Sequence, residues 1–160
     1  MRKTFFYPIL RKLKEGNLNW LFWQTINGIA LKYLNKILPK KIITGPVMAV
    51  LLLTYRCNSK CIMCDLPQRA LKAVDPEYST KQWKNIIKQL ADIHTGGIGF
   101  TGGEPLVRSD TPELITYAKS LGMATTLNTN AVLLHKENIK KVLDSDPDNI
   151  NISLDGINKE

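Results

Sequence analysis

Residues 47–64 read VMAVLLLTYRCNSKCIMC, an apolar run that ends in three closely spaced cysteines. The apolar part, residues 47–55, has the composition of a β-strand that is covered on both faces. Cys57, Cys61 and Cys64 follow with the spacing C-x3-C-x2-C, and the chain contains no other cysteine. Structural zinc sites and cubane iron–sulfur clusters normally take four protein ligands. A cluster bound by these three thiolates therefore keeps one iron free of protein ligands.

Length and composition indicate one globular domain with its own core, since the chain has 160 residues of which 44% are hydrophobic. No apolar run is long enough to span a bilayer, and the start of the chain lacks the apolar region and cleavage site of a signal peptide. Clustered cysteines without such a signal favour a reducing compartment and metal binding over a disulfide. We therefore expect a cytoplasmic protein.

The formal charge of +8 belongs almost entirely to one end of the chain. Residues 1–45 contain nine Lys and Arg residues and one acid, Glu15, whereas residues 46–160 contain 13 basic and 13 acidic residues and are neutral. A neutral main domain argues against nucleic acid as a partner. We therefore divide the chain into a basic helical extension, residues 1–45, and a main domain, residues 46–160.

Within the extension, residues 18–38 have the pattern of an amphipathic helix that ends at Pro39. Two tryptophans stand near its start, and apolar residues recur at helical spacing; these are Trp20, Trp23, Phe22, Ile26, Ile29, Ala30, Tyr33, Leu34, Ile37 and Leu38. Such a helix packs on the main domain with its lysines in solvent, or it binds a membrane surface. Packing is the more common case, and membrane binding stays open.

The main domain alternates strands with helices. We expect strands at residues 47–55, 98–101, 123–128 and 150–154, and helices after Ser79, after Asp110 or Thr111, and over 135–143. Ser79 and Gln82 have the spacing of a capping box. The alternation predicts an α/β fold with a parallel sheet, whose right-handed crossovers place every helix on one side. About four βα units do not close a barrel, so we expect a partial TIM-like barrel that is incomplete at the C-terminus.

Polar motifs follow all four predicted strands, at the edge where barrel enzymes build their sites. Beside the cysteine loop these are Gly102-Gly103-Glu104-Pro105, Asn128 to Ala131, and Ser153 to Gly156. The two glycines form a tight turn or let a ligand approach the backbone, and a carboxylate beside them can hold an ammonium group. Asn130 caps the helix predicted over 135–143, stabilises a turn or contacts a ligand, and Ser153 and Asp155 form a turn or bind sugar hydroxyls.

Two alternatives to a cluster remain for the cysteines. One is a zinc site completed by a histidine, but we expect His94 and His135, the two histidines of the chain, at the edge opposite the cysteine loop. The other is a set of inert buried thiols. The polar character of the loop argues against that, because Arg56 and Lys60 favour thiolates.

Together, the cysteine motif and GGEP resemble the radical S-adenosylmethionine superfamily over about residues 46–156. The resemblance implies a full or partial (β/α)6 barrel in which Cys57, Cys61 and Cys64 hold a four-iron, four-sulfur cluster (4Fe-4S). It also implies that the free iron takes the amino and carboxylate groups of S-adenosylmethionine. The implied contacts of that cofactor are Gly102, Gly103, Glu104 and Pro105 along its methionine part, Met63 near the adenine, Ser153 and Asp155 near the ribose, and Asn128 and Asn130 in the same cavity. The family often has an aromatic residue at Met63 and glycine at Ala131.

The activity implied by the resemblance is reductive cleavage of S-adenosylmethionine to a 5′-deoxyadenosyl radical that abstracts hydrogen from a substrate. The motif order most resembles the branch of peptide-modifying maturases and molybdenum-cofactor cyclisation enzymes. The implied partners are a small-molecule or peptide substrate and an electron donor such as flavodoxin or ferredoxin. The alternative function is a non-catalytic iron–sulfur or zinc module used in binding or sensing.

Overall fold

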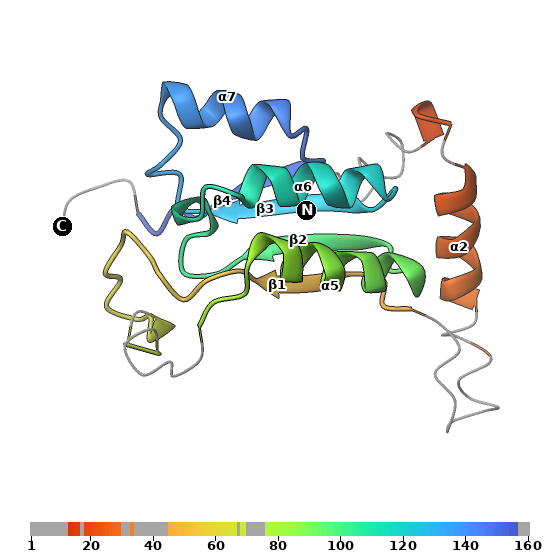
Figure 1. Cartoon of the computed structure of the whole chain (residues 1–160), viewed down its shortest axis with the longest axis horizontal. Helices are drawn as coiled ribbons and strands as arrows, with labels where there is room; N and C mark the ends of the chain where they lie inside the picture. Colours follow the sequence, from red (N-terminus) through yellow and green to blue (C-terminus); the bar gives the residue numbers. More distant parts are fainter. Residues whose placement is uncertain are drawn as a thin grey trace.

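Strands and helices alternate from residue 49 onward, as the hydrophobic pattern predicts (Figure 1). The computed structural model describes residues 13–16, 18–29, 33, 45–66, 68–69 and 76–156. In chain order, the elements are α2 (Leu18–Ile29), β1 (Ala49–Leu52), α5 (Thr80–Asp92), β2 (Gly97–Thr101), the 3-10 helix η2 (Pro105–Val107), α6 (Thr111–Ser120), β3 (Ala124–Thr129), α7 (Lys136–Asp144) and β4 (Asn149–Ile152).

The four strands of the described residues form one parallel sheet in the order β1-β2-β3-β4. The register places Leu51 beside Phe100, Phe100 beside Leu127, and Leu127 beside Ile150, so one row of apolar side chains crosses the sheet on one face. Helices α5, α6 and α7 cover this face (Figure 1), which is the arrangement expected from right-handed crossovers. The predicted α/β fold of the partial-barrel type is confirmed.

The core lies between this row and the three helices. Phe100, Leu114 and Leu127 have no exposed surface, and each contributes roughly 2 kcal/mol through burial. The core consists of Leu51, Leu53, Trp83, Ile87, Ile98, Phe100, Leu106, Leu114, Ile115, Ala118, Met123, Leu127 and Val142. Every described strand except β4 and every helix above the sheet contributes at least one of these residues, so the core holds the strand ends in fixed relative positions.

The other face of the sheet is open in the described residues. Val50 is 66% exposed and Leu52 is also exposed, whereas Leu51 between them is buried. The prediction that residues 47–55 are covered on both faces is therefore wrong for this structure. Successive side chains of a strand point to opposite faces, and only the face under the helices is filled.

The start of α5 is capped as the sequence predicts, whereas the start of α6 has no side-chain cap. Ser79 and Gln82 form the predicted capping box, with the Ser79 backbone N–H donating to Gln82 Oε1 at 2.8 Å. Asp110 is the N-cap residue of α6, but its side chain does not cap the helix. Its carboxylate instead accepts hydrogen bonds from Arg108 and Thr80, because a neighbouring guanidinium is a stronger partner than a backbone N–H.

Helix α2 packs at the end of the sheet where the strands begin (Figure 1). Trp20 Nε1 donates to the Gly96 carbonyl at 2.8 Å, and Asn27 Nδ2 donates to the His94 carbonyl at 3.1 Å. The Trp23 ring stacks on the His94 ring with 3.8 Å between centroids. The predicted packing of the extension on the main domain is therefore confirmed for residues 18–29.

The remainder of the extension is described only in part. The predicted helix over residues 18–38 is present as Leu18–Ile29, and residues 30–38, apart from Tyr33, lie outside the described residues. No helix in the described part of the chain is long and apolar enough to cross a bilayer. The division at residue 45 stays a prediction.

Candidate functional site

The loops that follow β1, β2 and β3 are joined at the carboxyl edge of the sheet. The Gly103 backbone N–H donates to the Thr54 carbonyl at 2.8 Å, and the Glu104 N–H donates to the Arg56 carbonyl at 2.9 Å. The strand ladder thus continues past the ends of β1 and β2. It holds the GGEP loop against the segment that leads directly into the cysteines.

The two glycines of GGEP are required by this close approach. A Cβ at Gly102 would lie 2.6 Å from the Thr54 carbonyl oxygen, and a Cβ at Gly103 would lie 2.4 Å from the Arg56 carbonyl oxygen. The sequence left a tight turn and the approach of a ligand as open interpretations. In the structure, what approaches the glycines is the backbone of the cysteine loop itself, so they fix the position of one loop against the other.

Glu104 is completely buried between the loops. Its Oε1 accepts hydrogen bonds from Thr129 Oγ1 at 2.8 Å and from the Leu106 N–H at 3.0 Å, and its Oε2 accepts from the Asn130 N–H at 2.8 Å. One carboxylate therefore ties the loop after β2 to the end of β3. A buried polar group costs free energy when it lacks partners, so this arrangement is stable only while all three donors stay in place.

Asn130 in turn ties the end of β3 to the cysteine loop. Its Nδ2 lies 2.8 Å from Asn58 Oδ1, 3.1 Å from Ser59 Oγ and 3.9 Å from Cys57 Sγ. Its Oδ1 accepts from the Val132 N–H at 3.0 Å, so the same side chain also forms the local turn. The Ser59 N–H donates to Cys57 Sγ at 3.4 Å. Hydrogen bonds to ligand sulfurs tune the reduction potential of iron–sulfur clusters.

The three cysteines are free thiols on one loop, with Cys57 partly buried and Cys61 and Cys64 exposed. Among the described residues, no three His, Cys, Asp or Glu side chains are gathered closely enough to hold a metal ion. The donor set fits an iron–sulfur cluster, because three thiols outside any disulfide lie within a short polar loop.

The other predicted site residues lie around this centre. Pro105 is buried and begins η2, and Asn128 is half-buried on the open face of the sheet. Met63, Ser153 and Asp155 are exposed. The structure therefore joins GGEP, Asn130 and the Cys57 end of the loop directly, and leaves Met63, Ser153 and Asp155 open to solvent.

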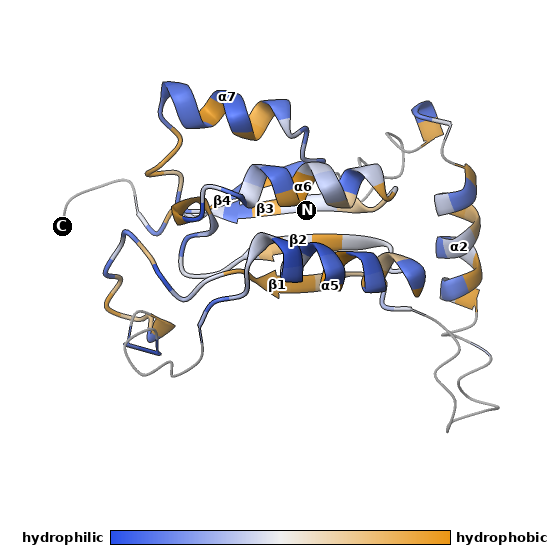
Figure 2. Ribbon diagram, in the orientation of Figure 1, coloured by the Kyte–Doolittle hydropathy of each residue, from blue (hydrophilic) through white to orange (hydrophobic). Residues whose placement is uncertain are grey.

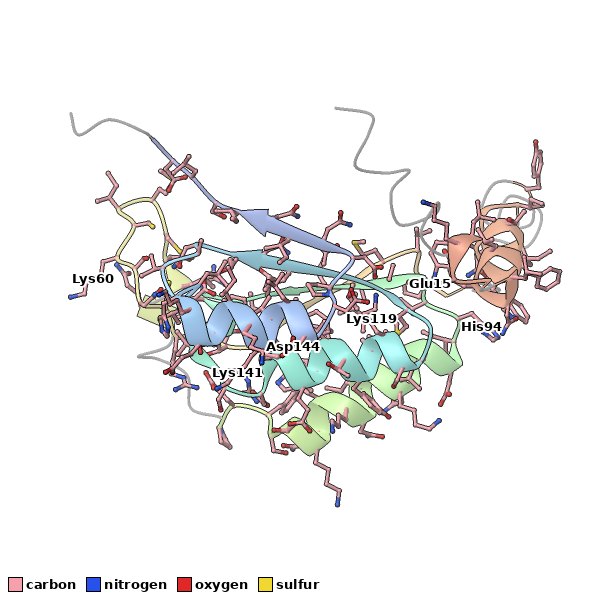
Figure 3. All side chains as sticks on the ribbon, turned by 90° about the horizontal axis from the view of Figure 1, so that it is seen from above. Glu15, Lys60, His94, Lys119, Lys141 and Asp144 are labelled. Atoms are coloured by element: carbon pink, nitrogen blue, oxygen red, sulfur yellow. The ribbon has the colours of Figure 1, made fainter. Side chains whose placement is uncertain are left out.

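The two histidines lie at different ends of the sheet. His94 precedes β2 and lies far from the cysteine loop, which Lys60 marks in Figure 3. The prediction for His94 is therefore confirmed. His135 is the N-cap residue of α7, which follows β3, so it lies at the same end as the cysteine loop and the prediction for it is wrong. A helix that follows a parallel strand begins at the carboxyl end of that strand. The Nε2 atom of His135 lies 3.3 Å from Asn138 Nδ2.

Glu77 follows the cysteine loop in sequence and contacts the residues at its start. Its carboxylate accepts a hydrogen bond from Thr54 Oγ1, and its Oε2 lies 3.0 Å from Arg56 Nη2 and 3.4 Å from Arg108 Nη1. Partial burial raises the pKa of Glu77, but hydrogen bonds from Thr54 and Arg56 and the charges of Arg56 and Arg108 outweigh it and hold the pKa below its ordinary value. Glu77 therefore fastens the two ends of the loop together in its ionised form.

We expect Glu77→Gln to lower the free energy of unfolding by about 1 kcal/mol at neutral pH. Because the folded-state pKa is lowered, this contribution is present above the unfolded-state value near 4.5 and is lost as the pH falls through the folded-state pKa. Urea unfolding of both proteins at neutral pH and at about pH 3 measures the difference.

The matched control is Glu113→Gln, since Glu113 pairs with Lys84 on the surface and is 56% exposed. We expect its effect to stay within about 0.5 kcal/mol. If the loss in Glu77→Gln has the same size at both pH values, the ionised carboxylate is not what fastens the loop.

Ala131 occupies a backbone conformation that favours glycine. Its φ is 64°, a left-handed value that costs a residue with a Cβ about 1–2 kcal/mol. The turn is nevertheless formed, because the Ala131 N–H donates to Thr129 Oγ1 at 3.0 Å and the Leu134 N–H donates to the Ala131 carbonyl at 3.0 Å. The chain therefore has alanine at a position where the resemblance leads to glycine, and it keeps a turn that suits glycine.

The sequence analysis did not mark Thr54 or Glu77, and it named Thr129 only as part of the motif Asn128 to Ala131, although all three residues hold the site together. Thr129 stands two residues after the buried Leu127, so the alternation of side chains could have placed it on the buried side. Thr54 directly follows the buried Leu53, so the same alternation would have placed it on the open face. Nothing in the sequence pairs Glu77 with a hydroxyl 23 positions earlier. That contact exists only because the loop returns to its own start.

Comparison with known proteins agrees with these motifs. A family model described as the Radical SAM superfamily matches residues 51–160. PqqA peptide cyclase of Bradyrhizobium diazoefficiens is 35% identical over 112 residues, which cover 70% of this chain and 29% of that protein. Fe-coproporphyrin III synthase of Methanosarcina barkeri is 38% identical over 105 residues, which cover 66% of this chain and 26% of that protein.

A solved structure is similar in fold as well as in sequence. Streptococcus suis SuiB bound to S-adenosylmethionine matches with a TM-score of 0.52 and 26% identity, over 71% of this chain and 26% of that one. The chain thus spans less than a third of the length of the relatives named here.

Proposed function

Because this chain belongs to the radical S-adenosylmethionine superfamily, we propose that it forms the cofactor-binding part of an enzyme that cleaves S-adenosylmethionine reductively. In this proposal Cys57, Cys61 and Cys64 hold a 4Fe-4S cluster. The observation that supports it most directly is the hydrogen-bonded union of three loops at one edge of the sheet, with Gly103 and Glu104 on the cysteine loop and Asn130 beside Cys57. A cysteine motif on an isolated loop would need none of these contacts.

The GGEP loop is proposed to line the methionine part of S-adenosylmethionine, with Glu104 next to its amino group. Both oxygens of Glu104 already accept hydrogen bonds from Thr129, Leu106 and Asn130. Its contribution to cofactor binding therefore comes mainly from holding the loop in shape. Glu104 acts as a positioning residue, and the backbone that it fixes presents the polar atoms to the cofactor.

The remaining cofactor contacts are proposed from the family motif. Met63 approaches the adenine, Ser153 and Asp155 approach the ribose, and Asn128 faces the same cavity from β3. Met63 is 79% exposed and Asn128 lies on the open face of the sheet, so both are accessible to a ligand at this edge. The exposed positions of Ser153 and Asp155 are likewise compatible with a ligand that covers them.

When bound, the cluster would supply the electron for the reductive cleavage of S-adenosylmethionine, which is the chemistry of the proposed function. The residues of this chain bind and orient the cofactor and tune the reduction potential of the cluster. The Ser59 N–H and Asn130 Nδ2 point at Cys57 Sγ, where they lower the charge density on a ligand sulfur. Glu77 and Glu104 fix the loops that bring cofactor and cluster together.

The substrate is not assigned. The relatives of similar identity include a peptide cyclase and a coproporphyrin synthase, so likeness at this level does not select between a peptide and a small molecule. We propose a flavodoxin or ferredoxin as the electron donor, which suits a cytoplasmic enzyme.

Anaerobic reconstitution of the full-length protein with iron and sulfide tests the proposal. We expect a cluster spectrum that changes when S-adenosylmethionine is added, and formation of 5′-deoxyadenosine when dithionite is supplied. A cluster that ignores S-adenosylmethionine would support the alternative, a module for binding or sensing. Uptake of zinc with no iron would support a zinc site.

A further inference from the structure

Helix α2 presents two different faces, and only one of them contacts the main domain. Trp20, Trp23 and Asn27 form the contact face, through hydrogen bonds and ring stacking to residues 94–96. Asn27 is the one residue of α2 that is fully buried. A helix that served only to cover this end of the sheet would need apolar residues on the contact face alone.

The opposite face is apolar and exposed. Leu18 is 70% exposed, Phe22 57%, Ile26 39% and Ile29 51%. At about 100° per residue these four lie within an arc of about 80°, centred roughly 130° from the contact face. We call them the apolar stripe. Figure 2 shows the hydrophobic residues along α2, which stands at one end of the sheet.

The net charge of the chain lies in the sequence segment that contains this helix. Residues 1–45 have a formal charge of +8 and the rest of the chain is neutral. Lys14, on the short helical turn before α2, is exposed. An exposed apolar helix face flanked by basic residues is the combination that binds at the interface of an anionic bilayer.

The location of α2 suits such an anchor. It lies at the end of the sheet where the strands begin, and the cysteine loop lies at the end where they finish, as the labels His94 and Lys60 show in Figure 3. A surface that covers the apolar stripe therefore leaves the cysteine loop in water, open to S-adenosylmethionine and to an electron donor.

We propose that α2 docks this protein on anionic membrane surfaces through the apolar stripe Leu18, Phe22, Ile26 and Ile29. A second copy of the chain is a poorer occupant, because pairing two such helices would bring two segments of charge +8 together. Four side chains also supply much less area than the roughly 1,200 Å² that stable protein interfaces bury. The proposal does not depend on the radical chemistry.

The test is co-sedimentation of the full-length protein with vesicles of equal parts phosphatidylglycerol and phosphatidylcholine, compared with vesicles of phosphatidylcholine alone. We expect binding to the anionic vesicles that weakens as sodium chloride rises from about 0.1 M to about 0.5 M. The double variant Phe22→Asp with Ile26→Asp should bind at least about tenfold more weakly. The matched control is Leu143→Asp on α7, where an apolar residue that is 59% exposed is changed in the same way, and it should bind like the wild type.

Three results would overturn the proposal. One is equal binding of the wild type to both kinds of vesicle, or none to either. Another is a mass by light scattering that falls by half in the double variant, which would assign the stripe to a second copy. The third concerns the melting temperature of the double variant, measured without vesicles. If it falls more than about 5 °C further than that of Leu143→Asp, another part of the protein covers the stripe. Formation of 5′-deoxyadenosine should be the same in all variants. A negative result for membrane binding would therefore leave the proposed function untouched.

Discussion

Replacement of Cys61 by alanine should leave the full-length protein without its cluster. Two thiolates cannot hold a cubane that already lacks a fourth protein ligand, so iron should fall from about four atoms per chain to nearly none. Formation of 5′-deoxyadenosine should fall at least about 100-fold, because even changes around a metal ligand cost 10- to 100-fold. Iron analysis and the visible absorbance of the anaerobically reconstituted protein measure the first effect.

Ile62→Ala is the matched control, since Ile62 is the next residue of the same loop and is fully exposed. We expect it to retain iron and activity. A Cys61→Ala protein that reconstitutes with full iron would show that another residue ligates the cluster in its place, and the assignment of three thiolates with one open iron would have to be abandoned.

Glu104→Gln should weaken the binding of S-adenosylmethionine by about tenfold or more while the cluster is retained, and it should lower the free energy of unfolding by about 1–3 kcal/mol. The physical reason is the count of donors around the carboxylate. An amide has one oxygen, so it cannot accept from the Asn130 N–H on one side and from the Leu106 N–H on the other. One buried N–H loses its partner, and the GGEP loop moves away from β3.

Isothermal titration with S-adenosylmethionine and urea unfolding measure the two effects. Glu137→Gln is the control, because Glu137 is exposed in the first turn of α7 and should change neither quantity by more than about 0.5 kcal/mol. Unchanged affinity in Glu104→Gln would remove Glu104 from the cofactor site. Unchanged stability would show that its buried hydrogen bonds are not needed to hold the loop.

The local features of this chain followed from residue types and spacing. The apolar run before Cys57, the capping box at Ser79 and the helical stripes each depend on interactions between residues close in sequence. The parallel sheet followed from their alternation. The strand limits differ from the predicted ones by up to three residues, since the ends of a strand depend on what its neighbours pair with.

The exposure of β1 shows where local pattern is insufficient. An unbroken apolar run is compatible with burial on one face or on two, and only the packing partners decide between them. Helices cover the face of Leu51, while Val50 on the other face is exposed in the described residues. The misplacement of His135 has a different origin, because the predicted parallel alternation already places the start of a helix at the carboxyl end of the strand before it.

The sequence by itself determined the chemistry that this protein can host: three thiolates on one loop, two glycines and a carboxylate on the next, and a strand order that sends both to the same edge. Tertiary structure alone decided how those loops hold one another. The contacts of Glu77 with Thr54, of Glu104 with Thr129, and of Asn130 with Cys57 join residues 23 to 73 positions apart. No short-range pattern encodes such pairs, because the distance between them is set by the packing of the whole sheet rather than by their spacing in the chain.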